Sequence, residues 1–209
     1  MVGTHTELKV TALVLNGNSL MMRMCGLVIH ELCKTLSTSI TVGCISKVDM
    51  NTLLYLHGYR TRFNPQGDKI QTLSPHWNVA GKTWDWDRES PTLKRELLQM
   101  VTEIQPDFIL GSSLGGYWGA VIGTEVGLPF VAINPAIEPA KVVAGEFEPF
   151  PDRGKGLILL DRGDRVISPW RTWDRFKDIH TIHMFGGGDH RFQHMEASID
   201  LIKIFLDRG

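Results

Sequence analysis

DFILGSSLGGYWGAV, residues 107–121, is an apolar run that breaks into glycine and serine and then resumes with small and aromatic residues. The run 108–110 has the length and the bounding signals of a buried strand, and the stretch 114–126 has the length of a helix. The glycine and serine residues between them therefore predict a turn from a strand into a helix. Catalytic and ligand-binding groups commonly lie at such turns.

The spacing of the glycines separates three known turns of this kind. The dinucleotide-binding pattern GxGxxG fails because Ser113 stands at the second glycine, and the phosphate-binding pattern GxxxxGK fails because Tyr117 stands at the lysine. The pattern GxSxG fits, with Gly111 and Gly115 on either side of Ser113. Ser112 has leucine at both of those positions, so the pattern selects Ser113.

The two glycines have a steric reason. At a sharp turn the serine adopts a strained backbone conformation that projects its hydroxyl above the sheet, and a side chain at either flank would strike the neighbouring strand or helix. The sequence therefore predicts Ser113 as a nucleophile, with Gly111 and Gly115 as its supporting residues.

From Met50 onwards the pattern alternates between strands and helices, which predicts an α/β fold with a mainly parallel sheet and helices on both faces. Ser90 with Pro91, and Ser168 with Pro169, are typical of helix starts. The expected strands are 52–56, one within 77–86, 108–110, 129–134, 157–161 and 181–185, and the expected helices begin at 90, 114, 168 and 193.

Active sites of such sheets lie at the carboxyl ends of the strands. A serine hydroxyl needs a base to take its proton, and the base needs an acid to hold its tautomer. Ser113, Asp164 and His190 each follow a predicted strand. They also come in the chain order nucleophile, acid, base that is typical of α/β hydrolases.

Three other histidines compete with His190 as the base. His180 and His183 fall in or beside a strand, where a hydrogen-bonded structural histidine is the commoner case, and His194 opens the last helix on a face that we expect to be solvated. His190 lies in a glycine-rich loop beyond a strand, from which it can reach Ser113.

Two other carboxylates compete with Asp164 as the acid. Asp161 belongs to the end of a strand, and Asp189 is adjacent to His190 and therefore poorly placed to orient it. Asp164 follows Gly163 in a loop that can turn towards the next loop along the sheet. We therefore expect Asp164 to orient His190.

The tetrahedral intermediate of acyl transfer needs two backbone donors at its oxyanion. The N–H of Leu114, directly after the nucleophile, is one candidate, and the N–H of Tyr59, after the first strand, is the other. His57 and Gly58 precede Tyr59 and are expected to form the turn that aims this N–H.

The blocks LLYLHGY, ILGSSLGGYWGAV, AINPAIEP, LDRGDRVI and GGGDHRFQHM resemble, in this order, those of the YqiA-like esterases, a family of small α/β hydrolases. The resemblance covers residues 50–205, and GSSLGGY with NPA is its most specific part. It implies an α/β-hydrolase fold with a small or absent cap, and it maps Ser113, Asp164 and His190 onto the nucleophile, acid and base. The stretch 61–88 departs from the family, which leaves substrate contacts there open.

Composition limits the partners of the chain. At 209 residues with 43% hydrophobic content, it is long enough for one sizeable core. Its net charge of −1 gives no electrostatic reason to expect nucleic acid or an anionic membrane as a partner. No apolar stretch reaches the roughly eighteen residues of a membrane span, and the N-terminus does not resemble a secretory signal. We expect a cytoplasmic protein with a small neutral substrate.

Residues 1–49 differ from the rest, because the chain's aromatic residues and prolines all come after Met50. Cys25, Cys33 and Cys44 lie in this segment without metal-type spacing, which fits reduced thiols. One interpretation extends the sheet with a strand from 8–15, a helix from 20–36 and a strand from 40–45. The other treats residues 1–49 as an extension of the hydrolase domain 50–209.

Two classes of function follow from the motifs. The first is a serine esterase or thioesterase that needs no metal or organic cofactor, or a lactonase or peptidase with the same three residues. The second is a binding protein that has the fold and the pocket but no turnover. A complete set of nucleophile, base and acid favours the enzyme, because binding alone needs none of them.

Overall fold

The computed structural model describes residues 12–15, 19–22 and 50–208. In the first part, strands β1 (Ala12–Leu15) and β2 (Ser19–Met22) pair antiparallel with each other. β1 lies within the strand expected over 8–15, whereas β2 stands where the helix expected over 20–36 would begin. The remainder of that helix, the strand expected over 40–45 and the three cysteines lie outside the described residues. The domain boundary at Met50 stays a prediction.

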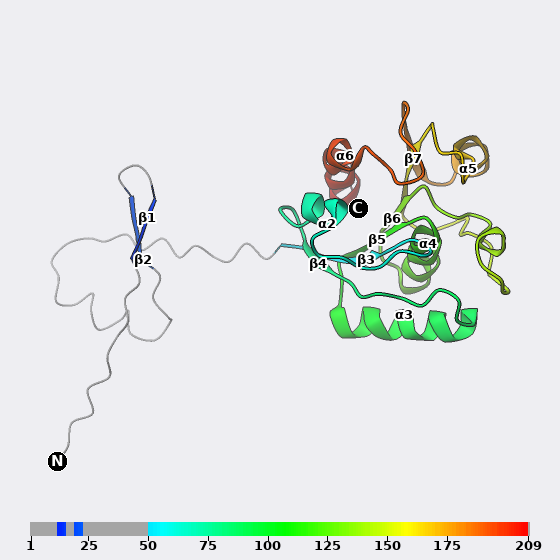
Figure 1. Ribbon diagram of the computed structural model, residues 1–209, viewed down its shortest axis with the longest axis horizontal. Coiled ribbons are helices and arrows are strands. Elements are labelled where there is room, and N and C mark those ends of the chain that lie inside the picture. The colour runs from blue at the N-terminus through cyan, green and yellow to red at the C-terminus, as the bar shows by residue number, and fades with distance from the viewer. Residues whose placement is uncertain (1–11, 16–18, 23–49, 209) are drawn as a thin grey trace, which may run out of the picture. The chain divides into compact units, whose positions relative to one another are not determined.

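Residues 50–208 contain a six-stranded sheet in which every neighbouring pair is parallel. The strand order is β4-β3-β5-β6-β7-β8 (Figure 1). This confirms the predicted α/β fold. The strands are β3 (Thr52–Leu56), β4 (Asn78–Ala80), β5 (Phe108–Ser112), β6 (Phe130–Ile133), β7 (Gly156–Asp161) and β8 (Thr181–Phe185).

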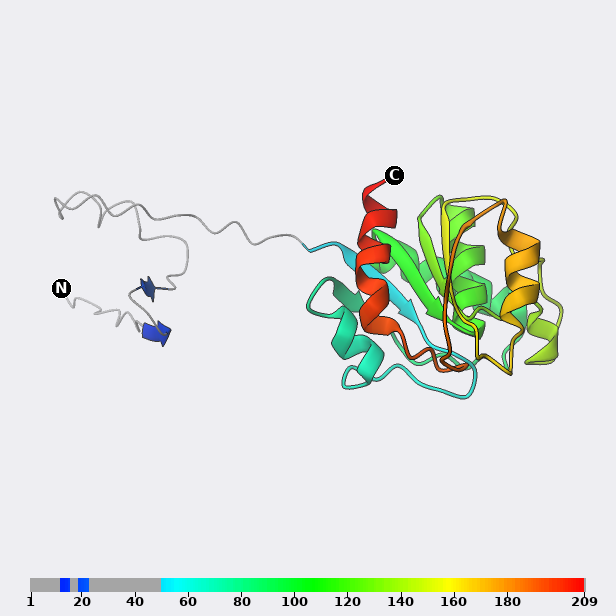
Figure 2. The same cartoon turned by 90° about the horizontal axis from the view of Figure 1, so that it is seen from above.

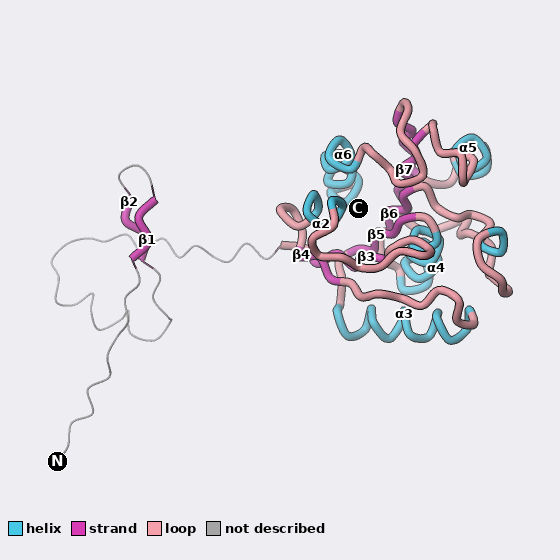
Figure 3. The backbone as a smooth tube through the Cα atoms, viewed as in Figure 1, coloured by secondary structure: helices cyan, strands magenta, loops and turns pink. Residues whose placement is uncertain are grey.

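Helices cover both faces of this sheet (Figure 3). One face carries α2 (Asp68–Leu73) and α6 (Met195–Asp207), and the other carries α3 (Ser90–Ile104), α4 (Leu114–Val126) and α5 (Pro169–Phe176). Within residues 50–208, each connection between successive strands contains one of these helices, except that between β6 and β7, which contains the 3-10 turn η1 (Pro139–Lys141). This agrees with a small or absent cap. None of the described helices is both long and apolar enough to cross a membrane.

Alternation along the strands explains the two layers of helices, because successive side chains of a strand point to opposite faces. In β3, Leu53 and Tyr55 belong to the hydrophobic cluster that includes residues of α2 and α6. Leu54 and Leu56 belong to the cluster that includes residues of α3 and α4. Every residue of the central strand β5 is buried. The sequence of this strand is therefore a continuous apolar run rather than an alternating one.

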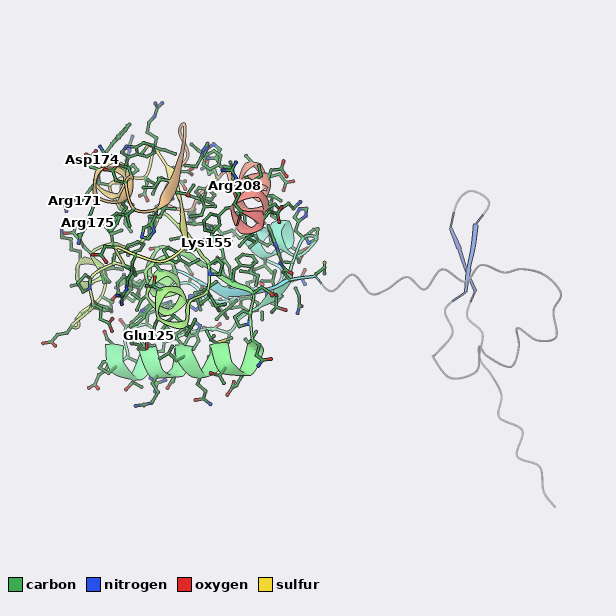
Figure 4. The ribbon with its side chains drawn as sticks, turned by 180° about the vertical axis from the view of Figure 1, so that it is seen from behind. Glu125, Lys155, Arg171, Asp174, Arg175 and Arg208 are labelled. Atoms are coloured by element: carbon green, nitrogen blue, oxygen red, sulfur yellow. The ribbon has the colours of Figure 1, made fainter. Side chains whose placement is uncertain are left out.

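Helix α5 has one buried face and one exposed face. Thr172 and Phe176 are buried, whereas Arg171, Asp174 and Arg175 are exposed and are labelled in Figure 4. Its first turn begins as predicted, because the Ser168 hydroxyl accepts a hydrogen bond from the Arg171 N–H.

Several boundaries differ from the expectations. β5 continues to Ser112, β6 is confined to Phe130–Ile133, and α6 begins at Met195 instead of at residue 193. Helix α2 was not predicted. The loops that follow the strands gather at one edge of the sheet (Figure 2), and the predicted site residues lie in them.

Candidate active site

The turn between β5 and α4 places Ser113 at φ 55° and ψ −118°, a conformation that a residue other than glycine rarely adopts. A Cβ at Gly111 would overlap the carbonyl of Gly115, and a Cβ at Gly115 would overlap the carbonyl of Leu56 at the end of β3. The steric reason given for the GxSxG pattern is therefore confirmed at both glycines.

The structure brings the predicted nucleophile, base and acid together. The Ser113 Oγ lies 3.0 Å from His190 Nε2, and His190 Nδ1 lies 2.8 Å from Asp164 Oδ2. An ionised carboxylate only accepts hydrogen bonds, so Nδ1 carries the proton and Nε2 is free to accept the serine proton. This is the orientation that general-base activation of a hydroxyl requires.

Asp164 is itself held in place. Its Oδ1 accepts hydrogen bonds from the N–H groups of Val166 and Ile167, at 2.8 and 3.0 Å. Its side chain is 1% exposed, whereas that of His190 is 26% exposed. Asp164 is therefore fixed by its own loop, whereas the His190 ring is partly open to solvent.

The competing histidines have other partners. His180 is buried and hydrogen-bonds through Nε2 to the Pro151 carbonyl, and His183 is an exposed residue of β8. The His194 ring stacks on the ring of Phe185, with 5° between the ring planes and 4.8 Å between the centroids. Its Nδ1 lies 2.6 Å from Asp161 Oδ1. His194 therefore has partners on β7 and β8, although its side chain stays 29% exposed.

The competing carboxylates also lie elsewhere. Asp161 is fully buried and accepts hydrogen bonds from the N–H groups of Asp189 and Gln193, at 3.2 and 2.9 Å. Asp189 accepts from the Arg191 N–H at 2.7 Å. Of the three aspartates considered, Asp164 is the one whose side chain meets His190.

The two proposed oxyanion donors lie at the expected turns. Leu114 is the first residue of α4, and Tyr59 is in the turn after β3. Neither N–H donates a hydrogen bond to another described residue. A Cβ at Gly58 would lie 3.3 Å from the Ser113 Cβ, so the turn that carries Tyr59 passes close to the nucleophile. Their role at the oxyanion stays a prediction.

His57 is a buried connector between this turn and the residues 84–86. Its Nε2 accepts from the Trp84 N–H at 2.8 Å, so its Nδ1 carries the proton and donates to the Gly58 carbonyl at 2.8 Å. The Trp86 indole donates to the same carbonyl at 3.2 Å. Burial lowers the pKa of His57, and the Gly58 carbonyl opposes this shift. Neutral His57 therefore fixes the turn before Tyr59.

The indole rings of Trp84 and Trp86 are both buried in the core. They belong to the stretch that departs from the YqiA-like pattern, and their contacts with His57 were not predicted. The aromatic residues Tyr117, Trp118 and Phe150 are core residues as well, with exposed fractions of 2% or less.

Asn134 is a site residue that the sequence analysis did not single out. Its backbone has a positive φ of 41°. Its side chain connects the end of β7 with the loop that follows β8. The Oδ1 accepts from the Asp161 N–H at 2.9 Å, and the Nδ2 donates to the Asp189 carbonyl at 3.1 Å. The NPA block that begins at Asn134 was the available signal.

Lys69 was also missed, because α2 was not predicted. Its Nζ donates to the Ser112 hydroxyl at 2.9 Å, directly beside the nucleophile in sequence. Burial lowers the pKa of Lys69 to about 8, and the charges of Asp161 and Asp189 oppose this shift. The partly buried Lys69 ammonium therefore lies beside Ser112 and close enough to Asp161 and Asp189 to be affected by their charges.

The lowered pKa of Lys69 predicts a pH-dependent stability. The folded protein releases this proton near pH 8, and the unfolded chain releases it near 10.5, so unfolded protein binds more protons between these values. We expect wild-type protein to gain stability relative to Lys69→Met as the pH rises from 7 to 10. Urea unfolding of both proteins across this range measures the difference, and a difference independent of pH would contradict the assignment.

Among the described residues, no group of three His, Cys, Asp or Glu side chains is arranged to hold a metal ion.

Comparison with protein families bears on the same part of the chain. Residues 52–150 match the model of UPF0227, an uncharacterised protein family. The UPF0227 protein of Shewanella sp. (strain MR-4) is 28% identical over 176 residues, which cover 73% of this chain and 98% of the relative. A UPF0227 protein of Yersinia pseudotuberculosis is 23% identical, with coverage of 75% and 99%. The resemblance to the YqiA-like family is confirmed.

Solved structures confirm the predicted fold of this chain. A putative α/β-superfamily hydrolase of Xanthomonas campestris has a TM-score of 0.63 at 16% identity, covering 77% of this chain and 99% of its own. Est1E from Butyrivibrio proteoclasticus has a TM-score of 0.61 at 14% identity, covering 77% and 88%. A monoacylglycerol lipase of Paleococcus ferrophilus has a TM-score of 0.59 at 13% identity, covering 77% and 96%. The chain therefore has the α/β-hydrolase fold.

Proposed function

We propose that this protein is a serine hydrolase that cleaves carboxylic esters or acyl thioesters through an acyl-enzyme intermediate. The observation that carries the proposal is the continuous hydrogen-bonded chain from Ser113 through His190 to Asp164, at 3.0 and 2.8 Å. A serine hydroxyl is a weak nucleophile until a neighbouring base takes its proton. This arrangement supplies such a base, with an acid partner that fixes its tautomer.

In the acylation step, the Ser113 Oγ attacks the carbonyl carbon while its proton moves to His190 Nε2. Asp164 accepts the Nδ1–H of His190 and stabilises the imidazolium that forms. The proton then passes from Nε2 to the leaving alkoxide or thiolate. The product of this step is an ester of Ser113, and the alcohol or thiol departs.

In the second step, His190 takes a proton from water, whose oxygen attacks the Ser113 ester. Collapse of the intermediate releases the carboxylic acid and returns the proton to Ser113. The oxyanion of both steps would accept hydrogen bonds from the N–H groups of Leu114 and Tyr59. The available N–H groups and the close passage of Gly58 past Ser113 support this assignment.

We choose esters and thioesters as the substrate class because an activated serine attacks acyl carbonyls. Two of the structural neighbours are named as enzymes that act on esters. One neighbour is an esterase domain from a Rhodothermus marinus protein, and another is a monoacylglycerol lipase. The test is a hydrolysis rate measured across aryl esters and acyl thioesters of graded chain length. Saturable hydrolysis is expected, and folded protein that hydrolyses none of them would favour the binding protein instead.

The proposal assigns the activity to residues 50–209. We expect a chain that begins at Met50 to fold and to hydrolyse the same ester within about threefold of the full-length rate, because the described core and the site residues all follow this position. Circular dichroism and turnover of the two chains measure this. An insoluble or inactive short chain would indicate that residues 1–49 complete the fold.

A further inference from the structure

A second buried carboxylate lies beside the proposed site and takes no part in its hydrogen-bonded chain. Asp161, the last residue of β7, is fully buried, and a buried carboxylate is costly unless its oxygens have partners. Both oxygens have them. Oδ2 accepts the N–H groups of Asp189 and Gln193, and Oδ1 lies 2.6 Å from Nδ1 of His194.

These partners lie on both sides of His190 in the sequence. Asp189 immediately precedes it, and Gln193 and His194 follow within four residues. The chain also passes directly against the carboxylate, because a Cβ at Gly188 would overlap Asp161 Oδ2. The loop 188–194 is therefore folded around the Asp161 side chain, with His190 at its outer part.

Asn134 ties the same loop to a second strand. It accepts from the Asp161 N–H and donates to the Asp189 carbonyl, so the ends of β6 and β7 and the His190 loop share one hydrogen-bonded cluster. The charges of Asp161 and Asp189 also act on the pKa of Lys69, whose ammonium donates to the Ser112 hydroxyl. The cluster lies behind the base, whereas Asp164 contacts the base directly.

We propose that Asp161 is a positioning residue, whose carboxylate holds the backbone at 189 and 193 so that His190 Nε2 stays within reach of Ser113 Oγ. The inference rests on the proposed function, because its effect on turnover is that of a displaced base. A displacement of about 1 Å in a catalytic group can reduce a rate on the order of 10²-fold.

Asp161→Asn tests this proposal. The carboxylate accepts hydrogen bonds at both of its oxygens, whereas an amide offers one accepting oxygen and an NH₂ group, so the partners of residue 161 in the loop must rearrange. We expect kcat to fall about 10-fold to 100-fold while KM stays within about twofold, because the displacement affects the base rather than substrate binding. Thr172→Val is the matched control, since Thr172 is equally buried but lies on α5, and its kcat should stay within about twofold.

A milder pair of variants covers the case in which Asp161→Asn does not fold. His194→Leu removes the donor to Asp161 Oδ1, whereas His194→Asn keeps an N–H near the position of Nδ1. We expect kcat to fall about 3-fold to 10-fold for the leucine variant and to recover to within about twofold for the asparagine variant. Equal kcat values for the two would overturn the proposal.

Proton NMR gives a readout that does not depend on turnover. The proton of His190 Nδ1, hydrogen-bonded to Asp164, should resonate at low field and be assigned by its loss in His190→Gln. We expect this signal in wild type and Thr172→Val, and its loss or broadening in Asp161→Asn. An unchanged signal and unchanged kcat in folded Asp161→Asn would overturn the positioning role. A wild-type protein without hydrolase activity but with the expected NMR changes would contradict the proposed function and leave the positioning role standing.

Discussion

Ser113→Ala is expected to lower the turnover of ester hydrolysis by about 10⁵-fold or more, an effect on the scale that loss of the nucleophile has in serine proteases. The reason is that no other hydroxyl lies within hydrogen-bond distance of His190 Nε2 among the described residues. Without Ser113, the covalent intermediate cannot form and water must attack the substrate directly. The measurement is single-substrate turnover of the fastest ester found for the wild type.

Ser112→Ala is the matched control for this prediction. The two serines are adjacent, but the Ser112 hydroxyl accepts a hydrogen bond from Lys69 and lies in β5 instead of at the turn. We expect its turnover to stay within about tenfold of wild type. If Ser112→Ala is the inactive variant and Ser113→Ala retains activity, the nucleophile is misassigned.

Asp164→Asn is expected to lower turnover by about 10⁴-fold, the scale of the corresponding change in serine proteases. The amide leaves His190 Nδ1 without an acceptor that fixes its tautomer, so Nε2 no longer points a free lone pair at Ser113. The fold should survive, because the asparagine can still accept the N–H groups of Val166 and Ile167 at its oxygen. Circular dichroism with turnover measures both expectations.

The comparison with Asp161→Asn decides between the two carboxylates. Substitution of a positioning residue is expected to lower turnover far less than substitution of the acid itself, by about 10-fold to 100-fold. The assignment of the acid is contradicted if Asp161→Asn is the severely impaired variant and Asp164→Asn stays within about tenfold of wild type, which is a loss of about 1.4 kcal/mol in transition-state stabilisation.

The turn at Ser113 could be predicted because a short sequence pattern encodes its constraints. The overlap at Gly111 arises within the turn, with the carbonyl of Gly115, whereas the overlap at Gly115 arises with the carbonyl of Leu56 on the neighbouring strand β3. The pattern GxSxG encodes both, because a turn of this kind requires a glycine at each position. Asp164 was predicted by a similar argument, since a residue in a loop after Gly163 can turn towards His190 while the strand residue Asp161 cannot.

The supporting residues could not be predicted, because their partners are distant in the sequence. His57 contacts Trp84 and Trp86 across a gap of almost thirty residues, and Lys69 contacts Ser112 across more than forty. Helix α2, which carries Lys69, has six residues and no side-chain cap, so it lacks the start signal that identified α5.

His194 shows contacts that could not be predicted for the same reason. A polar residue at the start of an amphipathic helix suggests a solvated face when the sequence is read alone. Its Nδ1 instead meets the buried Asp161, and its ring stacks on Phe185. Only the packing of α6 against the ends of β7 and β8 reveals these contacts.

Labelling with a fluorophosphonate probe tests the central claim most directly, because the probe requires an activated serine and reports which one reacts. Intact-mass analysis followed by peptide mapping identifies the modified residue. We predict one probe per chain, attached to Ser113, with labelling abolished in Ser113→Ala and strongly slowed in His190→Gln. Recovery of the probe on Ser112, or no labelling of folded protein that hydrolyses esters, would contradict the account.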